Sequence, residues 1–357
     1  MKVLYLTKYT RMAGSSRMRS FQYFPYLEKA GIQPVAKPFF DDAYLRDLYA
    51  GKKNIFSVLK SYIRRFFVLF TVFRYDIVVI EKEIFPYLPA FAEKILQILC
   101  VKYIADYDDA IFHNYDQSRN PLIRKFLGNK IGKVMKYSRV TVAGNQYLAD
   151  YAVKSGAGKV EIIPTVIDLD RYTVKRDSIS ENENFVVGWI GTKTTFEKHL
   201  LPCKKWIKEI QEKDPDIEFH IIGITEDMDL GNHIRYIPWT EKTEVEGILK
   251  MDIGIMPLED SLWERGKCAY KLIQYAACGI PGIASDVGMN REVTIQNETG
   301  FLVSSDEEWI NRIFELKNNR EERKLLGMNA RKLVEEKYCI QVTAERWCNL
   351  LGMKRTL

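Results

Sequence analysis

The feature that most limits the possible folds is the regular alternation of two kinds of segment along the chain. Short runs rich in β-branched and aromatic residues, such as Val3 to Leu6, Ile77 to Ile80 and Ile217 to Ile222, are separated by longer segments with helical period. This pattern is typical of parallel α/β architecture, in which a helix joins each strand to the next. The chain is therefore predicted to be α/β.

The predicted elements form two series separated by a polar, aperiodic segment from Pro164 to Asn184, which we expect to be a linker. The 357 residues are enough for two domains. The predicted domains are 1–165, 166–338 and a C-terminal helix, 339–357, that packs on the first domain. The expected strands are 3–6, 77–80, 102–105, 140–143, 160–163, 185–189, 217–222, 234–237, 253–257 and 281–284. The expected helices lie near 17–30, 53–73, 88–99, 119–136, 145–154, 196–212, 241–250 and 268–278, with three more from Glu307 onward.

The sequence gives no sign of export or of membrane insertion. The start, MKVLYLTKY, is broken by Lys8 and is too short for the apolar part of a secretory signal. The most hydrophobic stretch, Phe66 to Phe73, is much shorter than the roughly 20 apolar residues of a spanning helix. The six cysteines include no C-x-x-C pair, which argues against a zinc site or a disulfide framework. We expect a cytoplasmic protein with reduced thiols.

The charge is divided unevenly along the chain. Residues 1–165 contain 26 Lys and Arg against 14 Asp and Glu, whereas the remainder contains 27 against 33. A basic half suggests an anionic partner such as a membrane surface or a lipid phosphate. No nucleic-acid-binding motif is present, and the cations are interleaved with apolar helix faces, so nucleic acid is not an expected partner.

One basic segment is a candidate for peripheral membrane contact. Residues 48–75 contain no acid, and residues 52–74 mix aromatic and aliphatic residues with Lys52, Lys53, Lys60, Arg64, Arg65 and Arg74. A basic helix with aromatics can lie in an anionic membrane interface. The alternative is a helix packed on the sheet with its cations outward.

Two loops that follow strands have residues suited to anions. The first, TRMAGSSRMRS, contains Gly14, Ser15, Ser16 and Arg17, which are candidates for binding a phosphate or an anionic acceptor. The second, GWIGTKTT, places Gly191, Thr192 and Lys193 where a diphosphate can lie, because loops beyond the carboxyl ends of parallel strands lead into helix N-termini. Neither loop is a G-x-G-x-x-G or Walker sequence, which argues against a dehydrogenase or a kinase. A structural turn is the alternative for the first loop.

The most specific segment runs from Asp252 to Val303. It has a strand that ends in proline, then a loop, a helix ending in A-x-G-x-P, a short strand and a G-x-x-x-E turn. This order resembles the donor-binding half of the family 4 glycosyltransferases, and IIPTVIDLDRY at 162–172 is similar to their segment leading out of the first domain. The resemblance implies the GT-B fold, with two Rossmann-like domains facing each other across a cleft and a C-terminal helix crossing back. It also implies a retaining reaction with no metal.

By that resemblance, cationic side chains and helix-terminal N–H groups meet the charge of the leaving group. The implied donor-binding residues are Lys193, the backbone of Cys268 and Ala269, and Lys271, with Lys267 as a catalytic cation. Gly288 and Met289 bring backbone amides near the donor, and Glu292 is the acid expected beside it. Met289 can equally be part of a structural turn, and the alternative for Lys271 is that it only caps the solvent face.

The sequence departs from the family at one feature. The family usually has a pair of glutamates, and the corresponding positions here are Gly266 and Gln274. The amide of Gln274 can still hydrogen-bond a ribose diol. Gly266 offers no side chain, so neighbouring Glu264 is the candidate partner for the hydroxyl groups of the donor sugar.

A cluster of acids, ADYDDAIFH, follows the predicted strand at 102–105. Adjacent carboxylates can hold a metal or act as a base. With the GT-B interpretation we expect Asp109 or His113 to bind the acceptor or assist as a base. The alternative is that these residues are helix caps and turn acids.

The resemblance implies a hexosyltransferase that moves a sugar from a UDP- or GDP-linked donor, with no cofactor or metal, to a glycan or lipid-linked acceptor. Relatives of this kind act in surface polysaccharide or glycolipid synthesis. Two alternatives remain open: a noncatalytic glycosyltransferase-like binding subunit, and a GT-B sugar-nucleotide epimerase.

Overall fold

The computed structural model describes residues 1–52, 54–175 and 184–352, so Lys53 and most of the end of the predicted linker lie outside the described residues. The chain divides into two compact units. The first comprises Met1–Thr165, Gly266–Cys268 and the segment from Thr343 onward, and the second comprises Val166–Arg265 and Ala269–Val342.

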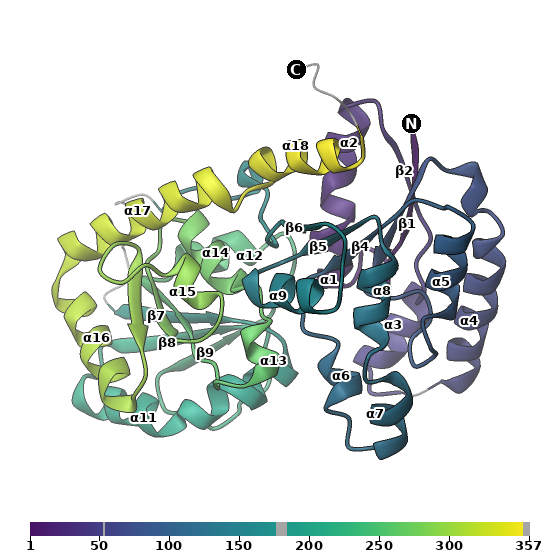
Figure 1. Ribbon diagram of the computed structural model, residues 1–357. Helices are drawn as coiled ribbons and strands as arrows, with labels where there is room; N and C mark the ends of the chain where they lie inside the picture. Colours follow the sequence, from purple (N-terminus) through teal and green to yellow (C-terminus); the bar gives the residue numbers. More distant parts are fainter. Residues whose placement is uncertain (53, 176–183, 353–357) are drawn as a thin grey trace. The chain divides into compact units, whose positions relative to one another are not determined.

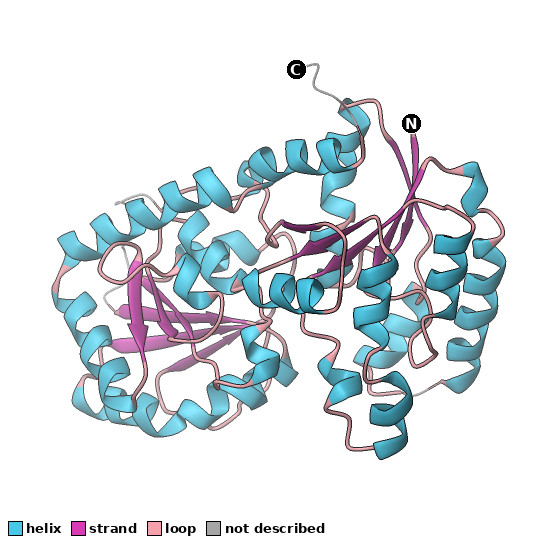
Figure 2. Ribbon diagram, in the orientation of Figure 1, coloured by secondary structure: helices cyan, strands magenta, loops and turns pink. Residues whose placement is uncertain are grey.

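Unit 1 contains a six-stranded parallel sheet with the order β2-β1-β3-β4-β5-β6 (Figure 1). The strands β1 and β3 to β5 are almost entirely buried because helices lie on both faces (Figure 2). The strands are β1 Lys2–Leu6, β2 Gln33–Ala36, β3 Ile77–Glu81, β4 Tyr103–Tyr107, β5 Val140–Ala143 and β6 Val160–Ile162. The helices are α1 Gly14–Arg19, α2 Phe24–Lys29, α3 Asp42–Tyr49, α4 Ile55–Leu69, α5 Phe91–Ile98, α6 His113–Asp116, α7 Pro121–Leu127, α8 Lys130–Tyr137 and α9 Gln146–Lys154.

Unit 2 contains a second six-stranded parallel sheet with the order β12-β11-β10-β7-β8-β9. Its strands are β7 Phe185–Ile190, β8 Ile217–Ile222, β9 Ile234–Ile237, β10 Ile253–Met256, β11 Gly282–Ser285 and β12 Gly300–Val303. Its helices are α10 Lys193–Thr195, a π-helical turn Phe196–Leu200, α11 Lys204–Lys213, α12 Glu244–Leu249, α13 Leu262–Arg265, α14 Tyr270–Ala277, α15 Asn290–Val293, α16 Asp306–Asn318 and α17 Arg320–Lys337. The last helix, α18, spans Ile340–Leu350.

The α/β prediction is confirmed, and every predicted strand is present within a residue or two at its ends. Strands β2 and β12 were not expected. Strand β2 contains Pro34, which argues against a strand in general but is tolerated here because β2 is an edge strand. The predicted helix at 17–30 is broken at Ser20, and the one at 119–136 is broken at Gly128 and Asn129.

Large aromatic side chains fill the core of unit 2. Trp206 of α11 stacks on Trp309 of α16, with ring centroids 5.3 Å apart and planes nearly parallel. Both are buried in the same cluster, and Trp206 also packs against Phe219 of β8. In unit 1 the buried Trp347 of α18 packs edge-on against Tyr23, whose hydroxyl lies 2.9 Å from that of Thr343. Among the described helices, none is both long and apolar enough to cross a membrane.

One close helix contact in unit 2 gives a test of the packing. A Cβ atom at Gly327 of α17 would overlap the backbone carbonyl oxygen of Gly279, which cannot move aside like the end of a side chain. Alanine normally stabilises a helix interior by about 1 kcal/mol relative to glycine. For Gly327→Ala we expect the opposite effect. The free energy of unfolding, measured by urea unfolding, should fall by about 1–3 kcal/mol. Gly158→Ala, which enters open space, is the control; a Gly327→Ala variant as stable as the wild type would show that the helices separate easily.

Candidate functional site

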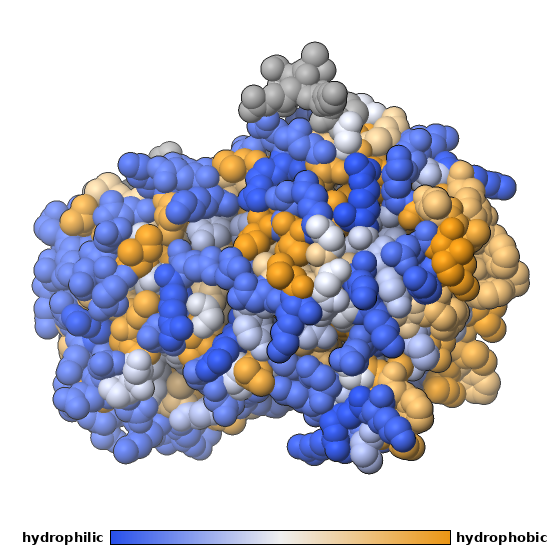
Figure 3. Space-filling model, in the orientation of Figure 1, coloured by the Kyte–Doolittle hydropathy of each residue, from blue (hydrophilic) through white to orange (hydrophobic). Residues whose placement is uncertain are grey.

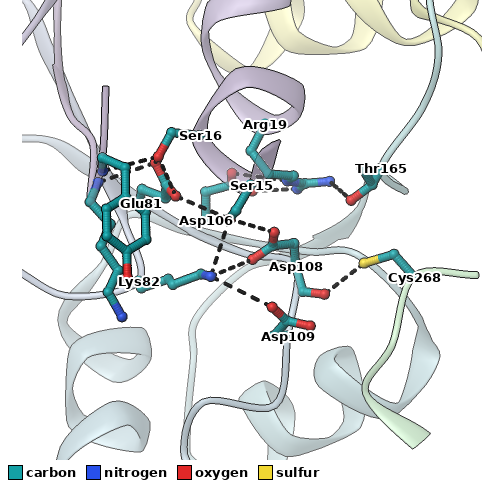
Figure 4. Close-up of polar contacts among 12 residues, drawn as sticks. Ser15, Ser16, Arg19, Glu81, Lys82, Asp106, Asp108, Asp109, Thr165 and Cys268 are labelled. Carbon is teal, nitrogen blue, oxygen red and sulfur yellow. Dashed lines mark hydrogen bonds and ion pairs between the residues drawn. The ribbon is translucent and has the colours of Figure 1, made fainter. Parts of the chain in front are cut away.

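The first candidate site lies at the carboxyl ends of β1, β3 and β4, which are neighbours in the sheet of unit 1 (Figure 4). Polar side chains arrive there from α1, from the turn after β3 and from the loop after β4. Ligands in doubly wound sheets bind at this edge, because loops lead from strand ends into helix N-termini.

Lys82, directly after β3, holds the centre of this cluster. Its Nζ lies 3.0 Å from a carboxylate oxygen of Asp108, 3.6 Å from one of Asp109, and 3.2 Å from the hydroxyl of Ser15. The backbone of Lys82 has a φ of 69°, a strained value for a residue with a side chain. The Lys82 side chain is buried, whereas that of Asp109 is 29% exposed, so Asp109 is the more accessible partner.

Two further buried carboxylates lie beside this lysine. Glu81 accepts hydrogen bonds from the hydroxyl of Ser16 at 2.7 and 2.9 Å, and burial raises its pKa even though Lys82 acts to lower it. Asp106 accepts two hydrogen bonds from the guanidinium of Arg19, and both side chains are only 1% exposed. The first candidate site is therefore a network of paired charges.

The short segment 266–268, grouped with unit 1, contacts this network. The thiol of Cys268 donates to the backbone oxygen of Asp108 at 2.6 Å, and the side-chain amide of Asn145 donates to the backbone oxygen of Lys267 at 3.0 Å. A Cβ atom at Gly266 would lie 2.5 Å from that of Ala110, so a larger residue has no room there unless the backbone moves.

The structure brings some of the predicted residues of unit 1 together. Ser15, Ser16 and Asp109 belong to the network, and Gly14 begins α1 with open space beside it. Arg17 is buried on the same helix. His113 lies apart in α6, where its ring nitrogens contact Asp116 at 2.8 Å and the hydroxyl of Tyr147 at 2.9 Å.

Lys82 is a residue that the sequence analysis did not select. Its position in the sequence could have pointed to it, because Lys82 lies one residue beyond a strand whose residues are all buried, where a lysine is unusual. Its importance depends on acids that are far away in the sequence.

The charge of Asp108 should make a measurable, pH-dependent contribution to stability. Burial acts to raise its pKa, but Lys82 and Arg19 outweigh this effect and lower the pKa to about 2. Because the unfolded value is near 3.9, the stabilisation is complete above that pH and is lost as the pH falls through 2. We expect Asp108→Asn to lower the free energy of unfolding by about 2 kcal/mol at pH 6. The difference in this free energy between variant and wild type should become smaller between pH 4 and pH 2.

Chemical denaturation at several pH values tests this expectation, with Asp260→Asn as the exposed control. A cost for Asp108→Asn that stays constant from pH 6 to pH 2 would show that the charge of Asp108 is not responsible.

The second candidate site is in unit 2, beside β7. From β7 the chain continues to β8 and β9 on one side of β7, and it then crosses to β10 on the other side of β7. Such a switch in strand order forms the ligand-binding crevice of doubly wound sheets. The loop after β7 contains Gly191, packed against the ring of Trp189, and Thr192, which forms a capping box with Thr195. Lys193 is exposed and pairs with Glu226 at 2.7 Å.

Helix α14 begins at this same edge of the sheet, after β10. Its N-cap residue, Ala269, has a φ of 49° and makes no side-chain capping bond, so the first N–H groups of the helix have no cap of that kind. Helix N-termini favour negative charge. Lys271 in the first turn places its Nζ 5.0 Å from the ring centre of Trp189.

Glu264 is at the centre of a buried polar cluster. Its carboxylate is fully buried and accepts from Lys198 at 2.6 Å and from the hydroxyl of Ser261, with His199 at 3.4 Å. Burial acts to raise the pKa of Glu264, but Lys198 and Ser261 outweigh it and hold the pKa below its usual value. This acid therefore fixes the position of a lysine.

Lys198 and His199 also line a pocket of about 790 Å³. Its walls come from the ends of β10, β11 and β12 and include Pro257, Asp260, Ser285 and Arg291. The sequence analysis did not select Lys198. The π-helical turn that contains it is a feature often found at functional sites, but it cannot be recognised from the sequence.

The residues that line this pocket include neither Glu264 nor any of the donor-binding residues predicted from the sequence. Gln274 is buried, and its amide donates to the hydroxyl of Tyr172 at 3.1 Å. Gly288, with a φ of 52°, packs closely against the backbone of Arg265, and Met289 is buried. Glu292 is half-buried, and burial raises its pKa although Lys337 acts to lower it. Within the described parts of the chain, no group of three or more His, Cys, Asp or Glu is arranged to hold a metal ion.

Comparison with known proteins shows the fold and gives a family match for part of the chain. Residues 178–333 match the family model described as glycosyl transferases group 1. No curated protein matches the sequence. The chain is similar over nearly its whole length to several solved structures at low sequence identity.

The sucrose-phosphate synthase of Thermosynechococcus elongatus has 12% identity and a TM-score of 0.70, with 98% of each chain covered. HepE of Anabaena, in complex with UDP and glucose, has 15% identity and a TM-score of 0.70, with 99% of each chain covered. A glycosyltransferase from Rickettsia africae has 14% identity and a TM-score of 0.69, covering 98% of this chain and 97% of that one. The predicted GT-B fold is confirmed.

Proposed function

We propose that this chain is a retaining glycosyltransferase that moves a hexose from a nucleotide-sugar donor to a glycan or lipid-linked acceptor. The observation that carries the proposal is the match of residues 178–333 to glycosyl transferases group 1, in a chain with the GT-B fold. Its place in surface polysaccharide or glycolipid synthesis, its independence of metal and its membership of family 4 are parts of the same proposal.

Unit 2 is proposed to bind the donor. Structures of HepE hold UDP and UDP-glucose, which supports a uridine nucleotide as the first donor to test. The N-terminus of α14, with Lys271 in its first turn, is suited to the diphosphate. Lys198, held by the buried Glu264, is a second cation at the same edge of the sheet.

The chemical task of these groups is to stabilise the diphosphate as it leaves the sugar. Negative charge grows on its oxygens when the bond to the anomeric carbon breaks, and N–H groups and ammonium groups that are already in position need little reorganisation. Glu264 contributes by positioning Lys198, because its carboxylate accepts hydrogen bonds from the Lys198 ammonium group and from the hydroxyl of Ser261.

Unit 1 is proposed to bind the acceptor. Asp109 is a partly exposed carboxylate beside Lys82, and a carboxylate in such a position can accept the proton of an acceptor hydroxyl. Ser15 and Ser16 are already bound to Asp108 and Glu81, so they act on the acceptor through the position of those acids.

A second function, nucleotide binding without transfer, is favoured by one observation. The positions of the family's two glutamates carry Gly266, which has no room for a side chain, and Gln274, whose amide is bound to Tyr172. Neither residue can supply a carboxylate to the donor.

The experiment that separates these functions uses the full chain and a panel of UDP- and GDP-sugars, without added metal and with a membrane lipid extract. Release of free nucleotide together with sugar in the lipid fraction supports the transferase. Retention of the anomeric configuration in the product is checked by NMR. Nucleotide binding with no turnover on any acceptor overturns the transferase proposal, and conversion of the donor without acceptor indicates an epimerase.

A further inference from the structure

Helix α4 presents its apolar side to solvent. Phe56, Phe66, Phe67 and Phe70 are between 51% and 79% exposed, and Ile55, Leu59 and Ile63 are more than half exposed as well. The side that faces the sheet contains the buried Ser61 and Arg65 instead. Arg65 donates to the backbone oxygens of Thr7 and Lys37 at 2.8 and 3.0 Å. This is the reverse of the usual arrangement of a surface helix, whose apolar stripe faces the core.

Helix α5 continues the same surface. Phe91, Ile95, Ile98 and Leu99 are 46% to 66% exposed, whereas Glu93, the helix's single acid, is buried and accepts from the backbone N–H of Ile84. The ring of Phe85 stacks on Tyr62 of α4 and on Phe91 of α5, which joins the two helices. In Figure 3 the apolar side chains gather over these two helices, at the right of the view. We call the outer faces of α4 and α5 the apolar surface.

The exposed charged residues on α4 and α5 themselves are basic, although one cation of α4, Arg64, pairs with Asp41 at 3.4 Å. Lys52, Lys60 and Arg74 are exposed along α4 and its ends, and Lys94 is exposed on α5. Residues 48–75 contain no acid. An anionic lipid headgroup layer complements such a rim, and its acyl boundary accepts aromatic and aliphatic side chains. Two copies of the chain joined through this surface would instead bring their basic rims together, which is unfavourable.

We propose that the apolar surface of unit 1 inserts into the interface of an anionic lipid bilayer, with α4 and α5 lying along the membrane. Helix α4 has 15 residues, about 22 Å, which suits a helix lying in the interface. The inference concerns α4 and α5 together, whereas the sequence pattern pointed to residues 52–74 alone. A lipid-linked acceptor would then meet unit 1 at the membrane, and that consequence rests on the proposed function.

Vesicle sedimentation with the full chain tests the inference without donor or acceptor, so its result is separate from that of the transferase assay. We expect binding to vesicles of phosphatidylcholine with phosphatidylglycerol, and binding weaker by about tenfold or more to phosphatidylcholine alone. Combining Phe66→Gln, Phe67→Gln and Phe70→Gln should weaken binding to the anionic vesicles by at least about 30-fold. These side chains are exposed, so the thermal unfolding temperature should stay close to that of the wild type.

The matched control combines Leu325→Gln and Met328→Gln, two exposed apolar residues of α17 in unit 2, and should bind like the wild type. Combining Lys60→Glu and Arg74→Glu should remove most of the preference for anionic vesicles. The inference is overturned if the wild type does not sediment with anionic vesicles, or if the phenylalanine variant binds as well as the control. It is also overturned if centrifugation of the wild type without lipid shows a dimer that the phenylalanine variant abolishes.

Discussion

Replacing Lys198 by methionine is expected to lower kcat/KM for the nucleotide-sugar donor by about 100- to 1000-fold, the usual effect of losing one preorganised donor to a developing oxyanion. Lys198 is 47% exposed, yet its Nζ is held 2.6 Å from a fully buried carboxylate of Glu264 and it lines the pocket of unit 2. In the proposed reaction, this arrangement would hold the ammonium group in place before the diphosphate starts to leave. Most of the loss should appear in kcat, because the charge on the leaving group grows in the transition state.

The matched control is Lys317→Met. Lys317 also pairs with a carboxylate, that of Asp214, and both side chains are about one-fifth exposed. It lies at the opposite edge of the sheet, since Asp214 ends α11 and precedes β8, so activity should stay within about twofold of the wild type. Lys198→Arg should keep part of the activity, because it restores the charge with a different shape. Turnover by Lys198→Met at nearly the wild-type rate would exclude Lys198 from the chemistry.

The second large effect is expected on stability. Replacing Arg19 by methionine should destabilise unit 1 by about 3–5 kcal/mol, the usual cost of leaving a buried charge without its partner. The Arg19 guanidinium donates to both oxygens of Asp106 and, through Nη1, to the backbone oxygen of Ile163 at 2.8 Å. Burial acts to lower the pKa of Arg19, but Asp106 outweighs it and the pKa is raised, so the guanidinium stays charged.

A double-mutant cycle separates the ion pair from the loss of packing. Asp106→Leu alone should also be strongly destabilising, whereas Arg19→Met with Asp106→Leu should cost clearly less than the sum of the two single changes, because neither charge is left alone. Hydrogen exchange is the suitable measurement, since it reports β1, β3 and β4 separately from the strands of unit 2. Arg235→Met, which removes a cation that is 63% exposed from its pair with Glu218, should change stability by less than about 1 kcal/mol. Additive costs in the cycle would show that the two charges do not stabilise one another.

Strand positions were predictable because they depend on local composition. A run such as Val140 to Ala143 is apolar and β-branched, and a strand buried on both faces needs little else. Strand β2 was missed because its local signal is contradictory: Pro34 weakens the pattern, and only the position of β2 at the edge of the sheet makes proline acceptable. Most of the longer helices were located, but α3 at Asp42–Tyr49 was missed, and so were the breaks at Ser20 and at Gly128.

The candidate sites were predictable only in part. Ser15, Asp109 and Gly191 were selected because loops after parallel strands bind ligands, and the structure places all three in such loops or at the helix that follows. Lys82 and Lys198 were missed because their significance comes from Asp108 and Glu264, residues distant in the sequence. Glu264 was selected for contact with the donor sugar, but the structure gives its carboxylate the partners Lys198 and Ser261.

The sequence by itself determined the class of fold and the half of the chain that matches glycosyl transferases group 1, because strand periodicity and a run such as Asp252 to Val303 are local properties of the chain. Only the tertiary structure decided which charged groups are paired and which sides of the helices are covered. Pairing of Arg19 with Asp106, or of Lys198 with Glu264, joins segments separated by more than 60 residues. In the same way, the periodicity of α4 defines an apolar face, but only packing against the sheet through Ser61 and Arg65 determines that this face points to solvent.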